Sequence, residues 1–256
     1  MVEARSSTGS EEFSGRGFVT LTPITRIFVS SKLEPGEVLD LPAGEANHLL
    51  KVLRGRTGDY VEVVDATGRL FAAELRRGGE ASVVEELAAP GGAGVEISLY
   101  QAVPKGGRMD LVVEKATEVG VTRIVPLLTE RGVVNPREGK VGRWRRVAEA
   151  AARQSLRLSV PEIAEPVRFE EAALTVGEAG VLLHHATNLQ PVEVVVQSPA
   201  NLFVGPEGGW SEGELRLTEE AGIAFGGLGP YRLRSETAGI VGVARTLAAL
   251  ESRVEH

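Results

Sequence analysis

The most informative stretch of the chain reads Leu202-Phe203-Val204-Gly205-Pro206-Glu207-Gly208-Gly209-Trp210-Ser211-Glu212. Its first three residues are apolar and predict a short buried strand over 201–204. The three glycines that follow allow a tight turn and a close approach of the main chain to a ligand. Ser211 and Glu214 have the spacing of a capping box, so a helix is expected to begin directly after the turn. A strand, a glycine-rich loop and a helix in this order form one unit of an α/β fold.

The chain on either side of this stretch repeats the alternation of strand and helix. Further apolar strands are predicted over 95–103, 123–128, 179–183 and 224–228. Helices are predicted from Met109 to a stop at Gly120, over 140–158, and over 236–250. Such alternation predicts a mostly parallel sheet covered by helices. Ligands of such sheets bind at the carboxyl ends of the strands.

Residues 25–94 show a different pattern. Short strands are predicted over 26–29, 60–64, 70–75 and 81–84, separated by glycine-containing turns, with one helix over 45–53. This spacing predicts a small antiparallel barrel, followed by a linker over 90–94. Residues 1–24 are rich in Ser, Thr, Gly and Glu without apolar periodicity, which predicts a disordered tail. The expected domains are therefore 25–94 and 95–256.

The composition excludes several classes of protein. Cysteine is absent, which rules out disulfides, thiolate metal sites and a cysteine nucleophile, and fits a reducing cytoplasm. No apolar run approaches the roughly 18 residues of a membrane helix, and no secretory signal is recognisable. The net charge of −7 argues against binding nucleic acid through bulk charge. Any RNA site must therefore be a local basic surface.

Three predicted strand ends carry loops suited to a flat ligand, namely 183–186, 205–209 and 228–238. Small and apolar residues there could wall a pocket for an adenine ring, with main-chain amides and carbonyls reading its edge. No Gly-Lys-Ser/Thr or Gly-x-Gly-x-x-Gly pattern follows, so a phosphate-binding loop is disfavoured. His184 and His185 are adjacent and would point to opposite faces of a strand, so no metal site is expected.

Two clusters of basic residues are candidates for contacts with RNA phosphates. One lies along a single face of the helix predicted over 140–158 and comprises Arg143, Arg146, Arg153 and Arg157. The other lies in the first domain and comprises Lys51, Arg54 and Arg56.

Six short motifs occur in a fixed order between Arg26 and the carboxyl end of the chain. They are His48-Leu49-Leu50-Lys51-Val52-Leu53-Arg54, Glu114-Lys115-Ala116-Thr117-Glu118-Val119-Gly120, Thr129-Glu130-Arg131, Gln154-Ser155 with Arg157, Gly205-Pro206-Glu207-Gly208-Gly209, and Leu233-Arg234-Ser235-Glu236-Thr237-Ala238. In this order and spacing they resemble the RsmE family of 16S ribosomal RNA uridine-N3 methyltransferases. The chain departs from that family's usual pattern at Arg153, at Gly132 and in a longer turn over 65–68.

The resemblance implies an α/β fold with a SPOUT-type parallel sheet and a C-terminal trefoil knot over 95–256, and a PUA-like β-barrel over 25–94. It also implies a homodimer that binds S-adenosyl-L-methionine and acts on 16S rRNA of the small ribosomal subunit. The implied cofactor-binding residues are Leu183, His184, Gly205, Pro206, Glu207, Gly208, Gly209, Leu228, Gly229, Leu233, Arg234, Thr237 and Ala238. The candidate RNA-binding residues are Arg26, Lys51, Arg54, Lys105, Arg143, Arg146 and Arg153.

The implied reaction needs help at the base, because uracil N3 carries a proton. A general base or a group that stabilises the uracil anion should act. Glu114 is a candidate base, and Arg131 and Arg157 are candidates for stabilising the anion. N3 lies on the Watson–Crick edge, so the target must be unpaired, and ribosomal subunits should be better substrates than free RNA.

Other functions remain open on the sequence alone. The substrate could be transfer RNA or another base within the same enzyme class. A noncatalytic RNA-binding or ribosome-assembly factor would keep the barrel and the basic clusters but would not bind the cofactor. A nucleotide-binding enzyme that uses the glycine loop for phosphate lacks the required Lys and Ser/Thr.

Overall fold

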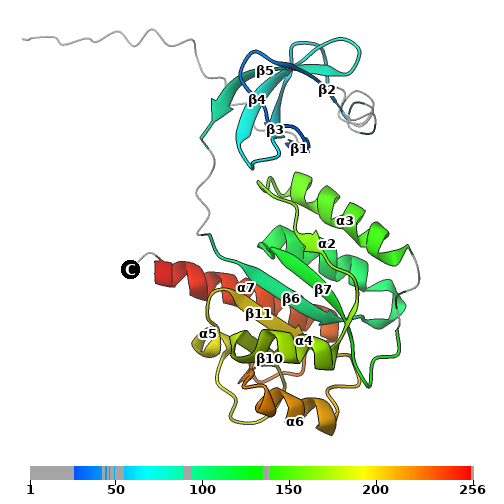
Figure 1. Cartoon of the computed structure of the whole chain (residues 1–256), viewed down its shortest axis with the longest axis vertical. Helices are drawn as coiled ribbons and strands as arrows, with labels where there is room; N and C mark the ends of the chain where they lie inside the picture. The colour runs from blue at the N-terminus through cyan, green and yellow to red at the C-terminus, as the bar shows by residue number, and fades with distance from the viewer. Residues whose placement is uncertain are drawn as a thin grey trace, which may run out of the picture.

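The computed structural model describes residues 26–41, 44, 46, 49, 55–88, 94–134, 136 and 139–254. The tail predicted over 1–24, most of the linker over 90–94 and most of the helix over 45–53 lie outside the described residues, as do Lys51 and Arg54. The described chain forms a five-stranded sheet followed by a seven-stranded sheet, as Figure 1 shows.

The first sheet has the strand order β1-β3-β4-β5-β2 and curls around a small apolar core. Its strands are β1 (Arg26–Phe28), β2 (Val38–Asp40), β3 (Tyr60–Val64), β4 (Leu70–Leu75) and β5 (Glu80–Leu87). The predicted antiparallel pairing is found for β3 with β4, β4 with β5 and β2 with β5, whereas β1 pairs in parallel with β3. The long connection from β1 through β2 to β3 provides the crossover that parallel pairing requires.

The second sheet is parallel throughout, as the sequence predicts. The strand order is β12-β10-β11-β6-β7-β8, and β9 also pairs with β7. The strands are β6 (Ile97–Ala102), β7 (Arg123–Leu128), β8 (Glu162–Ile163), β9 (Val167–Arg168), β10 (Gly180–Leu183), β11 (Ala200–Val204) and β12 (Ala224–Gly226).

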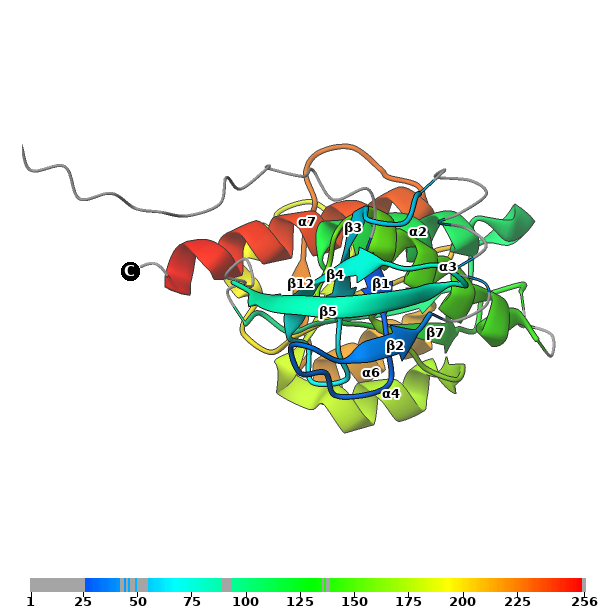
Figure 2. The same cartoon turned by 90° about the horizontal axis from the view of Figure 1, so that it is seen from above.

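Helices cover both faces of the parallel sheet (Figure 2). One face carries α2 (Met109–Val119), α3 (Lys140–Gln154) and α7 (Ser235–Val254), and the other carries α4 (Phe169–Val176) and α6 (Glu212–Glu220). Short pieces connect them: η2 (Lys105–Gly107), η3 (Gly177–Ala179) and α5 (Val192–Val195).

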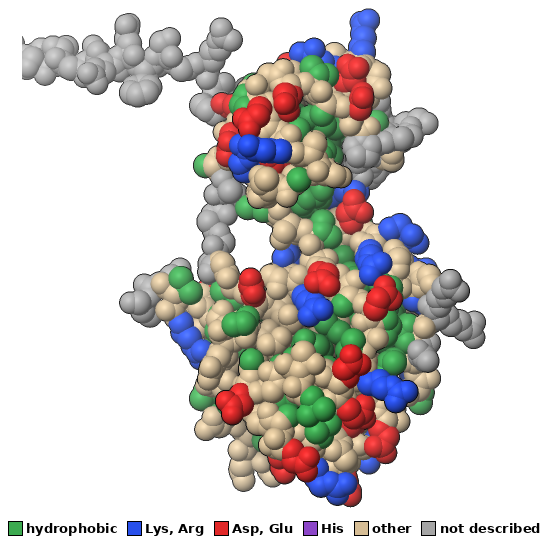
Figure 3. Space-filling view, viewed as in Figure 1, with side chains coloured by type: hydrophobic (Ala, Val, Ile, Leu, Met, Phe, Trp, Pro, Cys, Tyr) green, Lys and Arg blue, Asp and Glu red, His purple; other side chains and the backbone are tan. Residues whose placement is uncertain are grey.

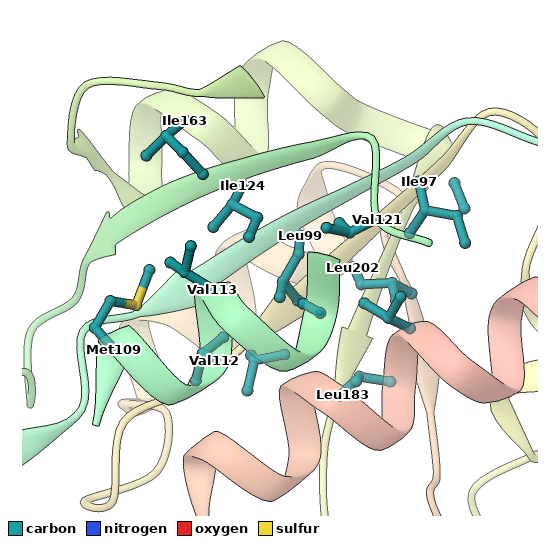
Figure 4. Packing of buried hydrophobic residues seen from close by; sticks show 14 of the residues in the cluster. Ile97, Leu99, Met109, Val112, Val113, Val121, Ile124, Ile163, Leu183 and Leu202 are labelled. Atoms are coloured by element: carbon teal, nitrogen blue, oxygen red, sulfur yellow. The ribbon is translucent and has the colours of Figure 1, made fainter. Parts of the chain in front are cut away.

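Alternate residues of the central strands fill the two cores. Leu99 on β6 belongs to the cluster under α2 and α7, whereas its neighbour Tyr100 belongs to the cluster under α4. Figure 4 shows Val113 of α2 near Ile124 of β7, and Leu99 belongs to the same cluster. Because both faces of these strands are buried, their sequences are continuous apolar runs.

The helix predicted over 140–158 is too long, because α3 ends at Gln154. The Ser155 hydroxyl donates to the main-chain oxygen of Ala151, 2.7 Å away, and Leu156 takes a positive φ of 55°. That backbone conformation cannot continue a right-handed helix. Arg157 therefore does not share a helical face with Arg143.

The two sheets meet where β1 lies against α3. Arg26 is 4% exposed; its guanidinium forms an ion pair with Glu62 (2.6 Å) and donates to the main-chain oxygen of Leu156. Arg26 thus connects the five-stranded sheet to the chain that follows α3. The buried guanidinium is used within the protein, and the assignment of Arg26 as an RNA-binding residue stays a prediction.

None of the described helices is both long enough and apolar enough to cross a membrane.

Candidate functional site

A cavity of about 440 Å³ lies at the carboxyl ends of β10, β11 and β12. The three loops singled out in the sequence form its walls, and every predicted cofactor residue lines it except Gly208 and Thr237. The structure adds six residues to the predicted set: His185, Val204, Trp210, Tyr231, Arg232 and Ser235. Sequence segments that are far apart therefore converge on one site, at the edge where parallel sheets bind ligands.

Two of the loops are joined by Trp210. Its ring nitrogen donates a hydrogen bond to the main-chain oxygen of Leu183, 3.2 Å away, and its side chain is buried. The indole packs against Gly205 so closely that a Cβ there would lie 2.9 Å from the ring carbon Cε2. Only glycine at 205 leaves room for this arrangement.

A second link joins β11 to α7 through hydroxyl and amide groups. The Ser235 hydroxyl donates to the main-chain oxygen of Gly205 at 2.6 Å. It also accepts a hydrogen bond from the side-chain amide of Gln101, at 2.9 Å. Gln101 is fully buried on β6, so the amino end of α7 is held against the centre of the sheet.

A third set of contacts ties the glycine loop to its neighbours along the carboxyl edge. The main-chain nitrogen of Lys105 donates to the Glu207 carboxylate at 3.0 Å. Arg232 donates to the Glu207 main-chain oxygen at 3.3 Å. Arg131 reaches the main-chain oxygen of Gly208 at 3.4 Å. Arg131 thus lies beside the glycine loop.

The capping box predicted at Ser211 is present, and it also positions the loop that carries Arg131. The Ser211 hydroxyl accepts from the main-chain nitrogen of Glu214 at 3.1 Å, and the Glu214 carboxylate accepts from that of Ser211 at 2.7 Å. The second oxygen of Glu214 accepts from the main-chain nitrogen of Glu130 at 2.9 Å. One buried carboxylate therefore connects α6 to the end of β7.

The two histidines face different surroundings. The His184 ring lies 6.3 Å from the ring of Phe225, whereas the His185 ring contacts the main-chain oxygen of Pro230 at 3.3 Å. Burial, with a further contribution from the adjacent His185, lowers the pKa of His184. A neutral imidazole is thereby favoured in the cavity wall at neutral pH.

Arg157 lies at the opposite edge of the parallel sheet. Its guanidinium donates to the main-chain oxygens of Thr117 and Val121, each at 2.7 Å, at the carboxyl end of α2. Burial lowers the pKa of Arg157. The eleven residues of α2 separate this point from the carboxyl edge of the sheet by about 16 Å. Arg157 therefore holds the end of α2 in this structure, away from the cavity, and its part in catalysis stays a prediction.

Glu114 also lies outside the lining of the cavity. Its side chain is 46% exposed on α2 and pairs with Lys115 at 2.7 Å. We expect Glu114→Gln to retain methyl transfer within about twofold, because loss of a true general base costs about a hundredfold or more. Initial rates of labelled methyl incorporation measure this, with Arg131→Ala as the comparison that should be slower. A drop of tenfold or more would restore Glu114 as the base.

The predicted RNA-binding residues on α3 differ in their surroundings. Arg143 pairs with Asp110 at 2.5 Å, and Arg153 pairs with Glu149 on its own helix. Arg146 is exposed, and no described residue pairs with its side chain. On the face in Figure 3, basic and acidic side chains are interspersed rather than gathered by sign. This face therefore offers RNA no extended basic surface.

Comparison with known proteins identifies the family. Residues 93–247 match a family model described as an RNA methyltransferase domain. The chain is 33% identical to the ribosomal RNA small subunit methyltransferase E of Synechocystis sp. over 222 residues, which covers 83% of this chain and 73% of that protein. The chain belongs to the ribosomal RNA small subunit methyltransferase E family.

Other members of the methyltransferase E family give the same result. The protein of that name from Mycobacterium bovis is 31% identical over 245 residues, covering 88% of this chain and 92% of the relative. A crystal structure of the Neisseria gonorrhoeae methyltransferase E, bound to S-adenosyl methionine, is 30% identical with a TM-score of 0.79. It covers 86% of this chain and 95% of that chain, so both sheets are included in the likeness.

Proposed function

We propose that this protein methylates N3 of a specific uridine in 16S ribosomal RNA of the small subunit, with S-adenosyl-L-methionine as the methyl donor. The observation that carries the proposal is the cavity formed by the loops after β10, β11 and β12. Membership of the methyltransferase E family and a relative solved with that cofactor support it.

The cavity residues fit an adenosyl group. Leu183, Val204, Leu228, Leu233 and Ala238 supply apolar walls, and main-chain groups of the glycine loop are available to hydrogen-bond a purine edge. The volume falls within the range of small-molecule sites. When bound, S-adenosyl-L-methionine supplies a methyl group on a sulfonium, and the S–C bond breaks with its electron pair left on sulfur as the N–C bond forms.

The protein must do three things for such a transfer. The cavity must hold the reactants in line, because positioning can supply roughly 7–11 kcal/mol of the barrier. It must exclude water from the reacting atoms. It must also let the N3 proton leave to a base or to solvent, while cationic groups stabilise the charge that develops on the uracil oxygens. Arg131, beside the glycine loop, is the sequence-predicted residue placed to contribute to the last of these.

The proposal extends to the fold and the assembly. We propose a C-terminal trefoil knot, in the region where α7 packs against β6 and β11 and Ser235 bonds to Gly205. The curled first sheet supports a PUA-like RNA-binding domain. A homodimer is supported by the exposed small residues Ala244 and Ala248 along α7. A ribosomal substrate would be met in the cytoplasm, and we propose that location for the protein.

The decisive experiment uses the purified protein, labelled S-adenosyl-L-methionine and small ribosomal subunits from cells that lack the protein. We expect one labelled nucleoside, 3-methyluridine, at a single site in 16S RNA. A short naked oligonucleotide of the same sequence should be a much poorer acceptor, because the structured subunit presents the unpaired base.

Other results of this experiment select the alternatives. Label in transfer RNA or in a different nucleoside would change the substrate within the same class. Calorimetry that detects no heat with the cofactor or its demethylated product would instead favour a noncatalytic RNA-binding or assembly factor.

A further inference from the structure

A second cavity, of about 270 Å³, lies next to the cofactor cavity on the carboxyl edge of the parallel sheet. It opens between the chain that follows β6 and the chain that follows β7. β6 is the neighbour of β11 in the sheet, so the two cavities occupy adjacent positions along one edge. Lys105 lies between Pro104 and Gly106, which line the second cavity, and its main-chain nitrogen donates to Glu207, which lines the cofactor cavity.

The lining of this cavity suits a flat, largely apolar ring. Its apolar residues are Val103, Pro104, Met109, Val134, Pro136 and Trp144. The ring nitrogen of Trp144 donates to the Asp110 carboxylate at 3.1 Å, which fixes the orientation of the indole. Walls of this kind accept a nucleobase that has left its stack.

The loop between the two cavities leaves space for a ligand. Gly106 and Gly107 have φ values of 68° and 76°, and a Cβ on either would meet nothing within 4 Å. Both glycines line the second cavity. No other atom therefore crowds the main chain of these glycines on the side where a base would lie. Lys105 and Lys140 are exposed next to the cavity, where they can bind RNA phosphates.

A cation stands at the junction of the two cavities. Arg108 lies between Gly107 and Met109, which both line the second cavity. Its guanidinium forms an ion pair with the Glu236 carboxylate at 3.2 Å. Glu236 follows Ser235, which lines the cofactor cavity. Glu236 is 8% exposed at its side chain, whereas Arg108 is 42% exposed. The buried carboxylate therefore holds the guanidinium, whose remaining N–H donors stay available.

We propose that the second cavity holds the target uracil, and that Arg108, positioned by Glu236, binds the oxygen atoms of the uracil anion. This inference rests on the proposed methyl transfer and adds the place of the acceptor base. Loss of the N3 proton puts negative charge on O2 and O4, and a guanidinium that faces them lowers the barrier. Arg108 was not predicted from the sequence to have a role, and Glu236 was predicted only as part of the loop over 228–238.

Filling the cavity tests where the base binds. Val134 lines it, whereas its neighbour Val133 is 66% exposed and does not. We expect Val134→Trp to lower kcat/KM on small subunits by about thirtyfold or more, with cofactor affinity within about twofold by calorimetry. Val133→Trp is the matched control and should retain both. A folded Val134→Trp protein with near-normal methylation would overturn the proposal.

Variants at Arg108 give an independent test that does not depend on how Val134→Trp folds. Arg108→Met should lower kcat more than tenfold with a smaller change in KM, and Arg108→Lys should restore part of it. The deficit of Arg108→Met should shrink as the pH rises, because free uridine then loses its N3 proton without help. Glu236→Gln should lower kcat by a smaller factor, and this deficit should also shrink as the pH rises. An unchanged kcat, or a deficit independent of pH, would contradict the role.

A crosslinking readout separates this inference from the proposed function. Small subunits reconstituted with 4-thiouridine are irradiated in complex with the protein, and the adducts are mapped on its peptides. We expect an adduct within 103–110 or 134–144 that Val134→Trp removes and Val133→Trp keeps. Adducts confined to the five-stranded sheet would overturn the inference alone. Absence of methylation by the wild-type protein would instead defeat the proposed function.

Discussion

Gly205→Ala is expected to weaken binding of S-adenosyl-L-methionine by about a hundredfold or more, which corresponds to about 2.7 kcal/mol. The new methyl group would lie 2.9 Å from Cε2 of Trp210, inside normal contact distance. The indole is packed against Phe169 at 5.0 Å between ring centres and cannot retreat freely. Displacement of the indole would break its hydrogen bond to the main-chain oxygen of Leu183. The two loops that this bond connects would then both shift.

Calorimetry on the folded variant measures this effect. Gly213→Ala is the matched control, because a Cβ at Gly213 meets its nearest neighbour at an ordinary 3.7 Å and lies within α6. That variant should keep full affinity, with stability raised by up to about 1 kcal/mol from helix propensity. If Gly205→Ala bound the cofactor normally, the cavity at the ends of β10, β11 and β12 would not be the cofactor site.

Asp65→Ala is expected to destabilise the five-stranded sheet by on the order of 3 kcal/mol. The Asp65 side chain is fully buried and accepts hydrogen bonds from the main-chain nitrogens of Leu33, Thr67 and Arg69. It also accepts from the Arg69 guanidinium at 3.0 Å. The alanine variant leaves these donors unsatisfied. Hydrogen exchange over residues 26–88 measures the loss, and cofactor affinity should not change.

The same carboxylate predicts a pH dependence. Burial alone would raise the pKa of Asp65, but hydrogen bonds from Thr67, Arg69 and Leu33 outweigh it and hold the pKa well below its usual range. Its stabilising contribution is therefore present above the unfolded pKa of about 4 and is lost as the pH falls toward the folded pKa. Protection of the wild-type sheet should fall in acid, and this loss should be absent in Asp65→Ala.

Asp40→Ala serves as the control for both measurements. Asp40 is exposed on β2, so its removal should change protection by no more than about 0.5 kcal/mol. Equal protection in Asp65→Ala and Asp40→Ala would show that the buried hydrogen bonds at Asp65 do not hold the sheet together.

Periodicity predicted the parts of the fold that have strong local signals. The strand over 123–128 and the capping box at Ser211 match the structure residue for residue. The three loops of the cofactor cavity were found because each follows an apolar strand and contains glycine or another small residue. These features depend on neighbours in the sequence, so the sequence alone reveals them.

Features that depend on tertiary contacts were missed or misjudged. Strands β8 and β9 have two residues each, and β2 has three, which is too short for a periodic signal. The sequence does not reveal that the guanidinium groups of Arg26 and Arg157 bond to main-chain oxygens within the protein. Arg108 and Glu236 are 128 positions apart in the sequence, so no local sequence pattern predicts their ion pair.

The amino end of α7 closes the cofactor cavity through Ser235 and Ala238. Ribosomes build the chain from its amino end, so every strand of both sheets is made before this last wall emerges. A growing polypeptide can therefore carry all its strands while its cavity is still open on one side. The methyl donor would bind only after the amino end of α7 has closed the cavity. By mass action, its binding would then stabilise only chains that have been synthesised through α7.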